Sequence, residues 1–392
     1  MSTPAEHAEL FKSSWVADPG LLEQSMREAR VSDRYTAELA AWCAEIHEHL
    51  RELAGALGIE LLLMGGNGAS LRFDAVAQRG SRDNDYLTAA TPENIGRLMD
   101  SLGQRFVALG ELMQPRPFEP KRPVRALPLK TYVVPVPLLL NHGHSTNNEV
   151  KVEFHFERRL PPAQTVTGTL GPAATPSITA ELPELPYQVG IKLMTLASDP
   201  VGIDESTRAA AVPRQMYDLD LLLAGLERHH WAALAEYTRE RYAEECELWD
   251  TEVQADEPFT GIRTRLERWG DCLDESATRW HVIRAAQQSG LRRAVHLRSW
   301  GWRARAYRLI IVAEALRLGD DGWDVWKTAH EAAAQVPVSS ARSFRPALAQ
   351  LAGVSVGQLP VELSDFIWPA LLAGDEDLPG HVARAAELLA AV

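Results

Sequence analysis

The hydrophobic pattern changes character partway along the chain. Up to about residue 160, short apolar runs alternate with stretches of helical spacing, whereas from residue 185 the spacing is helical almost to the C-terminus. A helix is predicted from Asp33 to about Leu57, with Gly58 ending it. Strands are predicted at residues 59–64, 84–89, 131–140 and 149–157. The pattern therefore predicts an α+β fold, in which a small mixed β-sheet with flanking helices is followed by an all-helical region.

Residues 161–186 contain several Pro, Gly and Thr residues, and they predict an irregular connection between the two regions. We accordingly expect a mixed domain with its N-terminal helices at residues 1–175 and a helical domain completing the site at 176–392. A glycine turn is predicted at 65–68, followed by a helix at 69–77, and Thr91 and Pro92 open another helix. Helices of the C-terminal half are predicted at 187–197, 213–226, 231–247, 262–288, 292–318, 323–334, 340–352, 361–372 and 381–391.

Composition narrows the function classes. With 46% hydrophobic and 24% charged residues, the chain has enough apolar material for sizeable cores. A net charge of −13 excludes a protein that coats nucleic acid with its whole surface, so any RNA contact needs a local basic patch. Cys43, Cys246 and Cys272 lie far apart and have no metal-ligand spacing, which fits a reducing compartment. We expect a cytoplasmic protein without a signal peptide or a membrane-spanning segment.

Two stretches of the N-terminal half carry candidate chemistry. Gly65 and Gly66 follow an apolar run, and glycines in such a turn let backbone N–H groups approach an anion closely. Asp83 and Asp85 alternate on a predicted strand, so both point to one face and repel each other unless a cation lies between them. A phosphate-binding turn beside a cation site suits a nucleoside triphosphate with magnesium. Glu153, on the polar face of another predicted strand, is the candidate third carboxylate.

The polar face that carries Glu153 also has a simpler interpretation. Lys151, His155 and Glu157 share that face, so it is equally typical of a solvent-exposed strand surface. His155 in particular is more typical of a surface histidine than of a ligand. The role of Glu153 as a metal ligand is therefore a hypothesis that depends on the tertiary structure.

Three charged residues on the predicted helices of the C-terminal half extend the candidate site. Lys192 falls on the first of these helices, where a lone cation could meet a phosphate. Arg214 and Asp218 are four residues apart on the next helix and so share one face. Each is also compatible with an ordinary helix surface.

These motifs together resemble the AbiEii-type nucleotidyltransferase toxins, a family within the DNA polymerase β-like nucleotidyltransferase superfamily. The resemblance covers roughly residues 60–225 and rests on a short set of motifs. They are Gly65-Gly66, Arg79-x-Ser81-x-Asp83-x-Asp85, the helical Lys192, and Arg214-x-x-x-Asp218 within Arg-Gln-Met-Tyr-Asp-Leu. The resemblance implies that the mixed domain is a nucleotidyltransferase domain.

The resemblance also implies roles for the first motifs. Gly65 and Gly66 fall on the turn that grips the nucleotide. Asp83 and Asp85 fall on the metal-binding pair, with Mg²⁺ as the cofactor and Mn²⁺ as a possible substitute. Ser81 takes the place of a serine beside that pair, which in some family members is itself modified.

The later motifs and the partners follow in the same way. Lys192 falls on the lysine that contacts the nucleotide, and Asp218 on the aspartate of the last motif. Glu153 or Asp218 would position or deprotonate the acceptor hydroxyl. Family members transfer a nucleotide from a nucleoside triphosphate to an acceptor, with tRNA 3′ ends known for several, and they are the toxin halves of toxin–antitoxin and phage-defence pairs. A cognate antitoxin is thus an implied partner.

The sequence departs from the family at three places that leave other functions open. Asn67 stands in a turn that usually reads Gly-Gly-Thr-Ala, Asn84 replaces an apolar β-branched residue between the aspartates, and Glu153 is longer than the usual third carboxylate. One alternative is nucleotidyl transfer to a small molecule, as in antibiotic-modifying enzymes. Another is an inactive nucleotide-binding regulatory protein, with Asn84 and Glu153 marking a decayed site.

One segment of the C-terminal half is both basic and aromatic. Guanidinium groups and aromatic platforms of this kind suit single-stranded RNA, although an amphipathic helix with buried Trp would show the same pattern. The segment comprises Arg292, Arg293, His296, Arg298, Trp300, Trp302, Arg303, Arg305, Tyr307 and Arg308.

Overall fold

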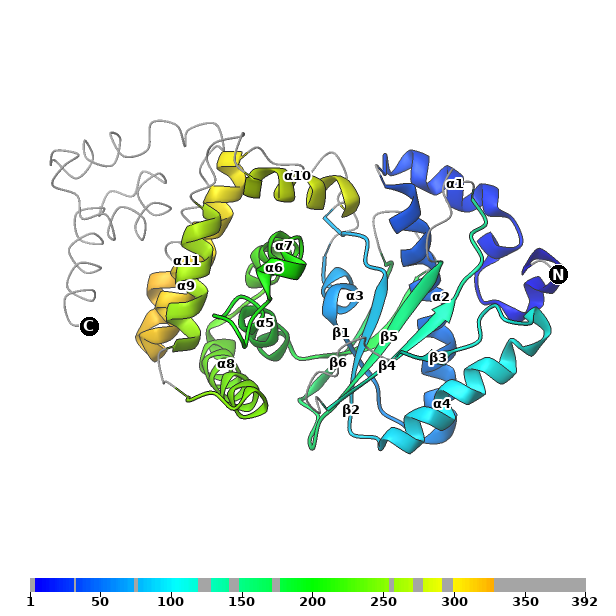
Figure 1. Cartoon of the computed structure of the whole chain (residues 1–392), viewed down its shortest axis with the longest axis horizontal. Coiled ribbons are helices and arrows are strands. Elements are labelled where there is room, and N and C mark those ends of the chain that lie inside the picture. Colours follow the sequence, from blue (N-terminus) through cyan, green and yellow to red (C-terminus); the bar gives the residue numbers. More distant parts are fainter. Residues whose placement is uncertain are drawn as a thin grey trace, which may run out of the picture. The chain divides into compact units, whose positions relative to one another are not determined.

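The computed structural model describes most of the first 327 residues. Its described ranges are 4–31, 33–73, 77–118, 128–140, 148–170, 177–253, 257–270, 278–290 and 299–327. These residues belong to two compact units, drawn in Figure 1. The first comprises the described residues up to Gln188 together with 284–290, and the second those of 189–283 and 299–327.

The helices of the first unit begin and end where local chemistry predicts. Helix α2 is capped by Asp33, whose carboxylate accepts a hydrogen bond from the Thr36 backbone N–H at 3.0 Å, and it ends at Gly58 with φ 66°. In α4, Thr91 is the N-cap and Pro92 the first helical residue, both as predicted. The helices of this unit are η1 (Pro4–Leu10), η2 (Ser14–Val16), α1 (Pro19–Glu28), α2 (Arg34–Leu57), α3 (Gly65–Ser70), α4 (Pro92–Arg105) and η3 (Val107–Leu109).

A mixed five-stranded sheet with the order β1-β2-β5-β4-β3 lies at the centre of this unit. Strands β2 and β5 are parallel, and every other neighbouring pair is antiparallel. The α+β class, with a small mixed sheet followed by helices, is therefore confirmed. The strands are β1 (Leu62–Met64), β2 (Asp83–Thr88), β3 (Arg116–Pro117), β4 (Leu129–Pro135) and β5 (Glu149–Phe156).

Two details of the predicted layout of the first unit are wrong. The helix predicted at 69–77 begins at Gly65, directly after β1, so the glycine turn forms the start of α3, with Gly65 at φ 63°. Residues 161–186 do not form an irregular connection, since β6 (Ala163–Gly168) and β7 (Ile178–Pro183) pair as an antiparallel two-stranded sheet. Most residues of β6 are exposed, so this strand lacks the apolar alternation by which a half-buried strand is recognised.

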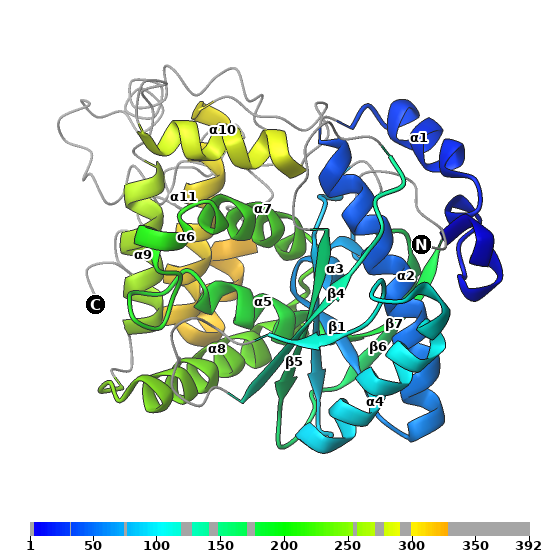
Figure 2. The same ribbon diagram turned by 45° about the vertical axis from the view of Figure 1, so that its right-hand side comes forward.

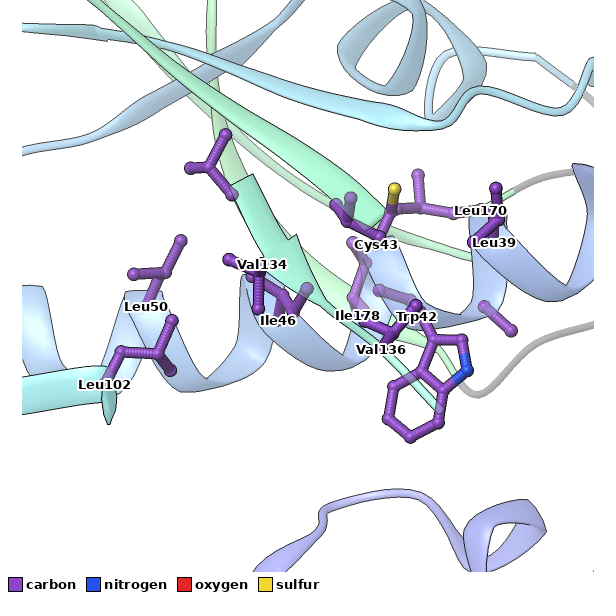
Figure 3. Close-up of a cluster of buried hydrophobic side chains, with 14 of the residues drawn as sticks. Leu39, Trp42, Cys43, Ile46, Leu50, Leu102, Val134, Val136, Leu170 and Ile178 are labelled. Atoms are coloured by element: carbon purple, nitrogen blue, oxygen red, sulfur yellow. The ribbon is translucent and has the colours of Figure 1, made fainter. Parts of the chain in front are cut away.

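The core of the first unit lies on one face of the five-stranded sheet, beneath α2 and α4. Figure 2 shows these two helices side by side, and Figure 3 shows α2 side chains meeting residues of the strands and of α4. On this face of β5, Val152 and Phe154 are fully buried, and Tyr86 of β2 is buried beside them. The residues labelled in Figure 3 are Leu39, Trp42, Cys43, Ile46, Leu50, Leu102, Val134, Val136, Leu170 and Ile178.

The remaining described segments are helical, as the spacing predicts. The single helix predicted at 262–288 is instead two helices, α9 and α10, and a short helix, α6, was not predicted. The helices predicted beyond residue 327 lie outside the described residues. In the part of the chain that the structure describes, no helix combines the length and apolar character needed to cross a membrane. The helices are α5 (Leu185–Met194), α6 (Glu205–Arg208), α7 (Ala211–Leu223), α8 (Arg228–Trp249), α9 (Glu257–Gly270), α10 (Thr278–Gly290), α11 (Ser299–Arg317) and η5 (Gly319–Asp321).

A buried histidine links α2 to both sheets of the first unit. Nδ1 of His47 lies 2.9 Å from the hydroxyl of Tyr86 on β2, and Nε2 lies 3.1 Å from the carbonyl oxygen of Thr179 on β7. Burial lowers the pKa of His47 and raises that of Tyr86 well above its ordinary value. The neutral imidazole therefore accepts from the Tyr86 hydroxyl and donates its Nε2–H to Thr179.

We predict a pH-dependent contribution of His47 to stability. Its folded pKa lies below the ordinary value of about 6.5, so the stabilisation is fully present above that pH and is lost as the pH falls through the folded pKa. In urea unfolding, the stability difference between the wild type and His47→Gln should shrink from pH 7.5 to pH 5. The exposed His229 is the control, since His229→Gln should leave the pH profile unchanged. A difference for His47→Gln that is independent of pH would refute the neutral assignment.

Candidate active site

The face of the sheet opposite α2 and α4 carries the predicted site. On β2, Asp83 and Asp85 point to this face, while Asn84 points to the core. The parallel register places Asp85 opposite Glu153 and Asp83 opposite Lys151. Register therefore brings two of the three predicted carboxylates into direct juxtaposition.

Asp85, Glu153 and His155 form a compact group of possible metal ligands. One carboxylate oxygen from each acid and one ring nitrogen of His155 all lie within 4.8 Å of one another, and all three residues are half-buried. Ligand atoms about 2.1 Å from a shared metal ion lie roughly 3–4 Å apart, so small side-chain rotations suffice to enclose an ion. The donor set thus fits a divalent cation, and a carboxylate oxygen of Glu153 lies within 4.8 Å of one of Asp85.

Asp83 lies two residues before Asp85 on β2 and does not belong to this group. It begins β2 on the same face, but among the described residues it belongs to no cluster of three ligands. Its role as a metal ligand stays a prediction. Conversely, His155 joins the cluster although sequence reasoning favoured a surface role, because spacing along one strand does not show what the neighbouring strand presents.

The glycine turn lies close to the site because Gly65 and Gly66 have no side chains. A Cβ at Gly65 would overlap the carboxylate of Asp85, and one at Gly66 would lie 2.6 Å from the guanidinium of Arg79 and 2.8 Å from the hydroxyl of Ser81. Gly65 therefore lets the start of α3 contact Asp85 directly, and Gly66 brings Ser81 and Arg79 against the same turn. Binding of a nucleotide by Gly65, Gly66 and Ser81 stays a prediction.

The two asparagines that depart from the family pattern are hydrogen-bonded to each other. Nδ2 of Asn67 donates to Oδ1 of Asn84 at 2.8 Å and to the backbone oxygen of Asp83 at 2.9 Å. Asn84 in turn donates to the backbone oxygen of Cys43 in α2 at 2.9 Å. Both asparagines are fully buried. This bridge ties the glycine turn, the strand of the aspartates and α2 together.

In the second unit, Lys192 and Asp218 are paired with each other. Nζ of Lys192 lies 2.8 Å from Oδ2 of Asp218 and 3.1 Å from Oε1 of Gln215, and both charged residues are buried. The predicted cation of α5 and carboxylate of α7 thus form an ion pair. Their roles toward a nucleotide stay predictions.

The described part of the basic and aromatic segment points inward. Arg305 and Arg308 both bind Asp220 of α7, with N–O distances of 2.7–2.8 Å, and Trp302 is buried beside Arg305. Although burial alone would raise the pKa of Asp220, the two guanidinium groups hold it well below its ordinary value. The RNA-binding interpretation is wrong for Trp302 and Arg305, which are buried, whereas Arg308 is half-buried. Arg292, Arg293, His296, Arg298 and the side chains of Trp300, Arg303 and Tyr307 lie outside the described residues.

Comparison with known proteins finds only distant structural likeness. No family model and no curated protein matches the chain, so the AbiEii resemblance stays a prediction. MenT4, a nucleotidyltransferase toxin from Mycobacterium tuberculosis H37Rv, has a TM-score of 0.40 at 14% identity, over 94% of this chain and 98% of that one. JHP933 from Helicobacter pylori has a TM-score of 0.35 at 13% identity, over 74% of this chain and 95% of that one. Both likenesses are weak, and the proposed function therefore depends on the side chains described above.

We predict that Gly65→Ala destabilises the protein more than its backbone conformation explains. Gly58 has nearly the same φ, 66° against 63°, but a Cβ there meets no atom within 4 Å. Gly58→Ala should therefore cost only the left-handed strain of about 1–2 kcal/mol, whereas Gly65→Ala must also displace the Asp85 carboxylate. Urea unfolding of the two variants measures the difference, and equal losses would contradict the close approach of Gly65 to Asp85.

We further predict that Asn67 and Asn84 are energetically coupled. Each change to Ala should cost about 1–3 kcal/mol, since a buried polar partner loses its hydrogen bond. The double variant should cost less than the sum of the two, with a coupling of roughly 0.5–3 kcal/mol. Asn94→Ala on the exposed start of α4 is the control and should change stability by at most about 0.5 kcal/mol. Additive losses would show that the bridge does not act as a unit.

Proposed function

We propose that this protein is a magnesium-dependent nucleotidyltransferase of the toxin–antitoxin type, which transfers a nucleotide from a nucleoside triphosphate to an RNA acceptor. The observation that supports it most is the juxtaposition of Asp85 and Glu153 by strand register, directly beside the glycine turn. Two carboxylates held this close on a half-buried face favour a bound cation. A turn that brings backbone against such a site suits the phosphates of the same substrate.

The reaction needs positioning and charge neutralisation more than covalent chemistry by the protein. The oxygen of the acceptor hydroxyl forms a bond to the α-phosphorus, the bond from that phosphorus to the bridging oxygen breaks, and pyrophosphate leaves. When bound, a divalent cation would neutralise the phosphate charge and acidify the acceptor hydroxyl. Asp85 and Glu153 would hold that cation, and Glu153, with two carboxylate oxygens, would also accept the proton of the hydroxyl.

The remaining residues of the proposal rest on the motif resemblance. Asp83 acts as the second carboxylate of the metal pair, Ser81 and the turn contact the nucleotide, and Lys192 and Asp218 keep their predicted roles. The tRNA 3′ end as acceptor and a cognate antitoxin as partner have the same basis. The cytoplasm as location rests on the cysteine pattern and on the N-terminal sequence.

A small-molecule acceptor is the second candidate. One observation favours it: Trp302, Arg305 and Arg308, which the sequence offered as part of an RNA-binding surface, are engaged within the second unit. An enzyme that modifies a small molecule needs no basic surface of that kind.

The proposal predicts metal-dependent labelling of an acceptor. The purified full chain should transfer label from at least one α-³²P-labelled nucleoside triphosphate, each offered separately with MgCl₂, to total RNA. Glu153→Gln should reduce the labelling rate by about 100-fold or more, since loss of a preorganised charged group commonly has effects of this size. If the RNA stays unlabelled and an acid-soluble labelled product forms in a small-molecule extract, the second candidate is favoured.

The matched control for this experiment lies on the same strand. Glu149 is on the same face of β5, four residues before Glu153, and makes an exposed ion pair with Arg116. Glu149→Gln should keep activity within about twofold, because an exposed pair contributes little. Equal labelling by the wild type and by both variants would refute the assignment of Glu153, and binding of nucleotides without turnover on any acceptor would indicate an inactive nucleotide-binding protein.

A further inference from the structure

We infer that Asp85, Glu153 and His155 together bind a first-row transition-metal dication of the manganese type in preference to magnesium. The inference rests on the proposed function, because it concerns the metal of the same site. It changes that proposal in two respects. The preferred ion is Mn²⁺ in place of Mg²⁺, and an imidazole nitrogen joins a ligand set in which the motif resemblance implies carboxylates alone.

Strand geometry is the first support. Glu153 and His155 are two residues apart on β5 and therefore point to the same face, while the parallel register sets Asp85 beside Glu153. The side chains converge, since their donor atoms lie within 4.8 Å of one another although they come from two strands and three positions. On the other side of β5, Thr131 of β4 pairs with Glu153 in the same row.

The chemistry of the donor set is the second support. Mg²⁺ is a hard cation that prefers oxygen ligands and keeps much of its water, whereas imidazole nitrogen favours transition metals. Carboxylate oxygens combined with one imidazole therefore select Mn²⁺ and later first-row dications over Mg²⁺. Three protein ligands also leave coordination positions for substrate oxygens.

The glycine turn is compatible with this position of Asp85. A Cβ at Gly65 would overlap the Asp85 carboxylate, so the absence of a side chain there leaves the room that the carboxylate occupies beside Glu153 and His155.

The experiment measures metal binding without nucleotide or acceptor. The metal-free full chain is titrated with MnCl₂ and with MgCl₂ by calorimetry, and with CoCl₂ by visible absorption, for the wild type, His155→Ala and His229→Ala. The wild type should bind Mn²⁺ at least tenfold more tightly than Mg²⁺. His155→Ala should lose at least tenfold in Mn²⁺ affinity and change the Co²⁺ absorption bands, while its Mg²⁺ affinity stays within about threefold. His229→Ala removes an exposed imidazole of α8 and should behave as the wild type.

The outcomes separate this inference from the proposed function. Equal affinity of the wild type for Mn²⁺ and Mg²⁺, unchanged Mn²⁺ and Co²⁺ binding in His155→Ala, or no metal binding at all would overturn the inference. Metal binding as expected, without labelling of any acceptor, would refute the proposed function but support the metal site. Thermal unfolding of His155→Ala checks that a loss of affinity is not a loss of folding, and Glu153→Gln, which should weaken Mn²⁺ and Mg²⁺ together, provides a second variant at the same site.

Discussion

The parallel pairing of β2 and β5 is the constraint on which the candidate site depends. It sets Asp85 opposite Glu153 on one face, and Tyr86 opposite Phe154 on the other. The second pair is fully buried against the core of the first unit. A slip of one residue in β2 would turn its aromatic residue out of that core, so the hydrophobic effect holds the carboxylates in register. The chemistry of one face is thus positioned by packing on the opposite face.

The two asparagines that depart from the family pattern, Asn67 and Asn84, are joined by a hydrogen bond. Asn67 and Asn84 look unrelated along the chain, and the sequence offered Asn84 as one mark of a decayed site. In the fold Nδ2 of Asn67 donates to Oδ1 of Asn84 in a fully buried position, and the two side chains also donate to the backbone oxygens of Asp83 and Cys43. A buried amide needs such partners, so the two asparagines have a shared structural role.

Charged residues of the second unit that the sequence offered as contacts for a nucleotide or RNA form ion pairs with one another in the structure. Arg305 and Arg308 neutralise Asp220, and Lys192 pairs with Asp218. Such pairs are costly to break, because the remaining partner would be an uncompensated charge away from water. Basic residues that look like a nucleic-acid surface in the sequence are here part of the interior packing between α7 and α11.

The sequence by itself determined the local features, because caps, glycine stops and apolar spacing depend on near neighbours. Asp33 and Gly58 at the ends of α2, Thr91 and Pro92 at the start of α4, and the strand of Glu153 are of this kind. Only the tertiary structure decided what faces what. The meeting of His155 with Asp85, the contact of Gly65 with that carboxylate, and the inward direction of Arg305 involve partners 20 to 85 residues away. No local pattern encodes such distances, since they follow from strand register and helix packing.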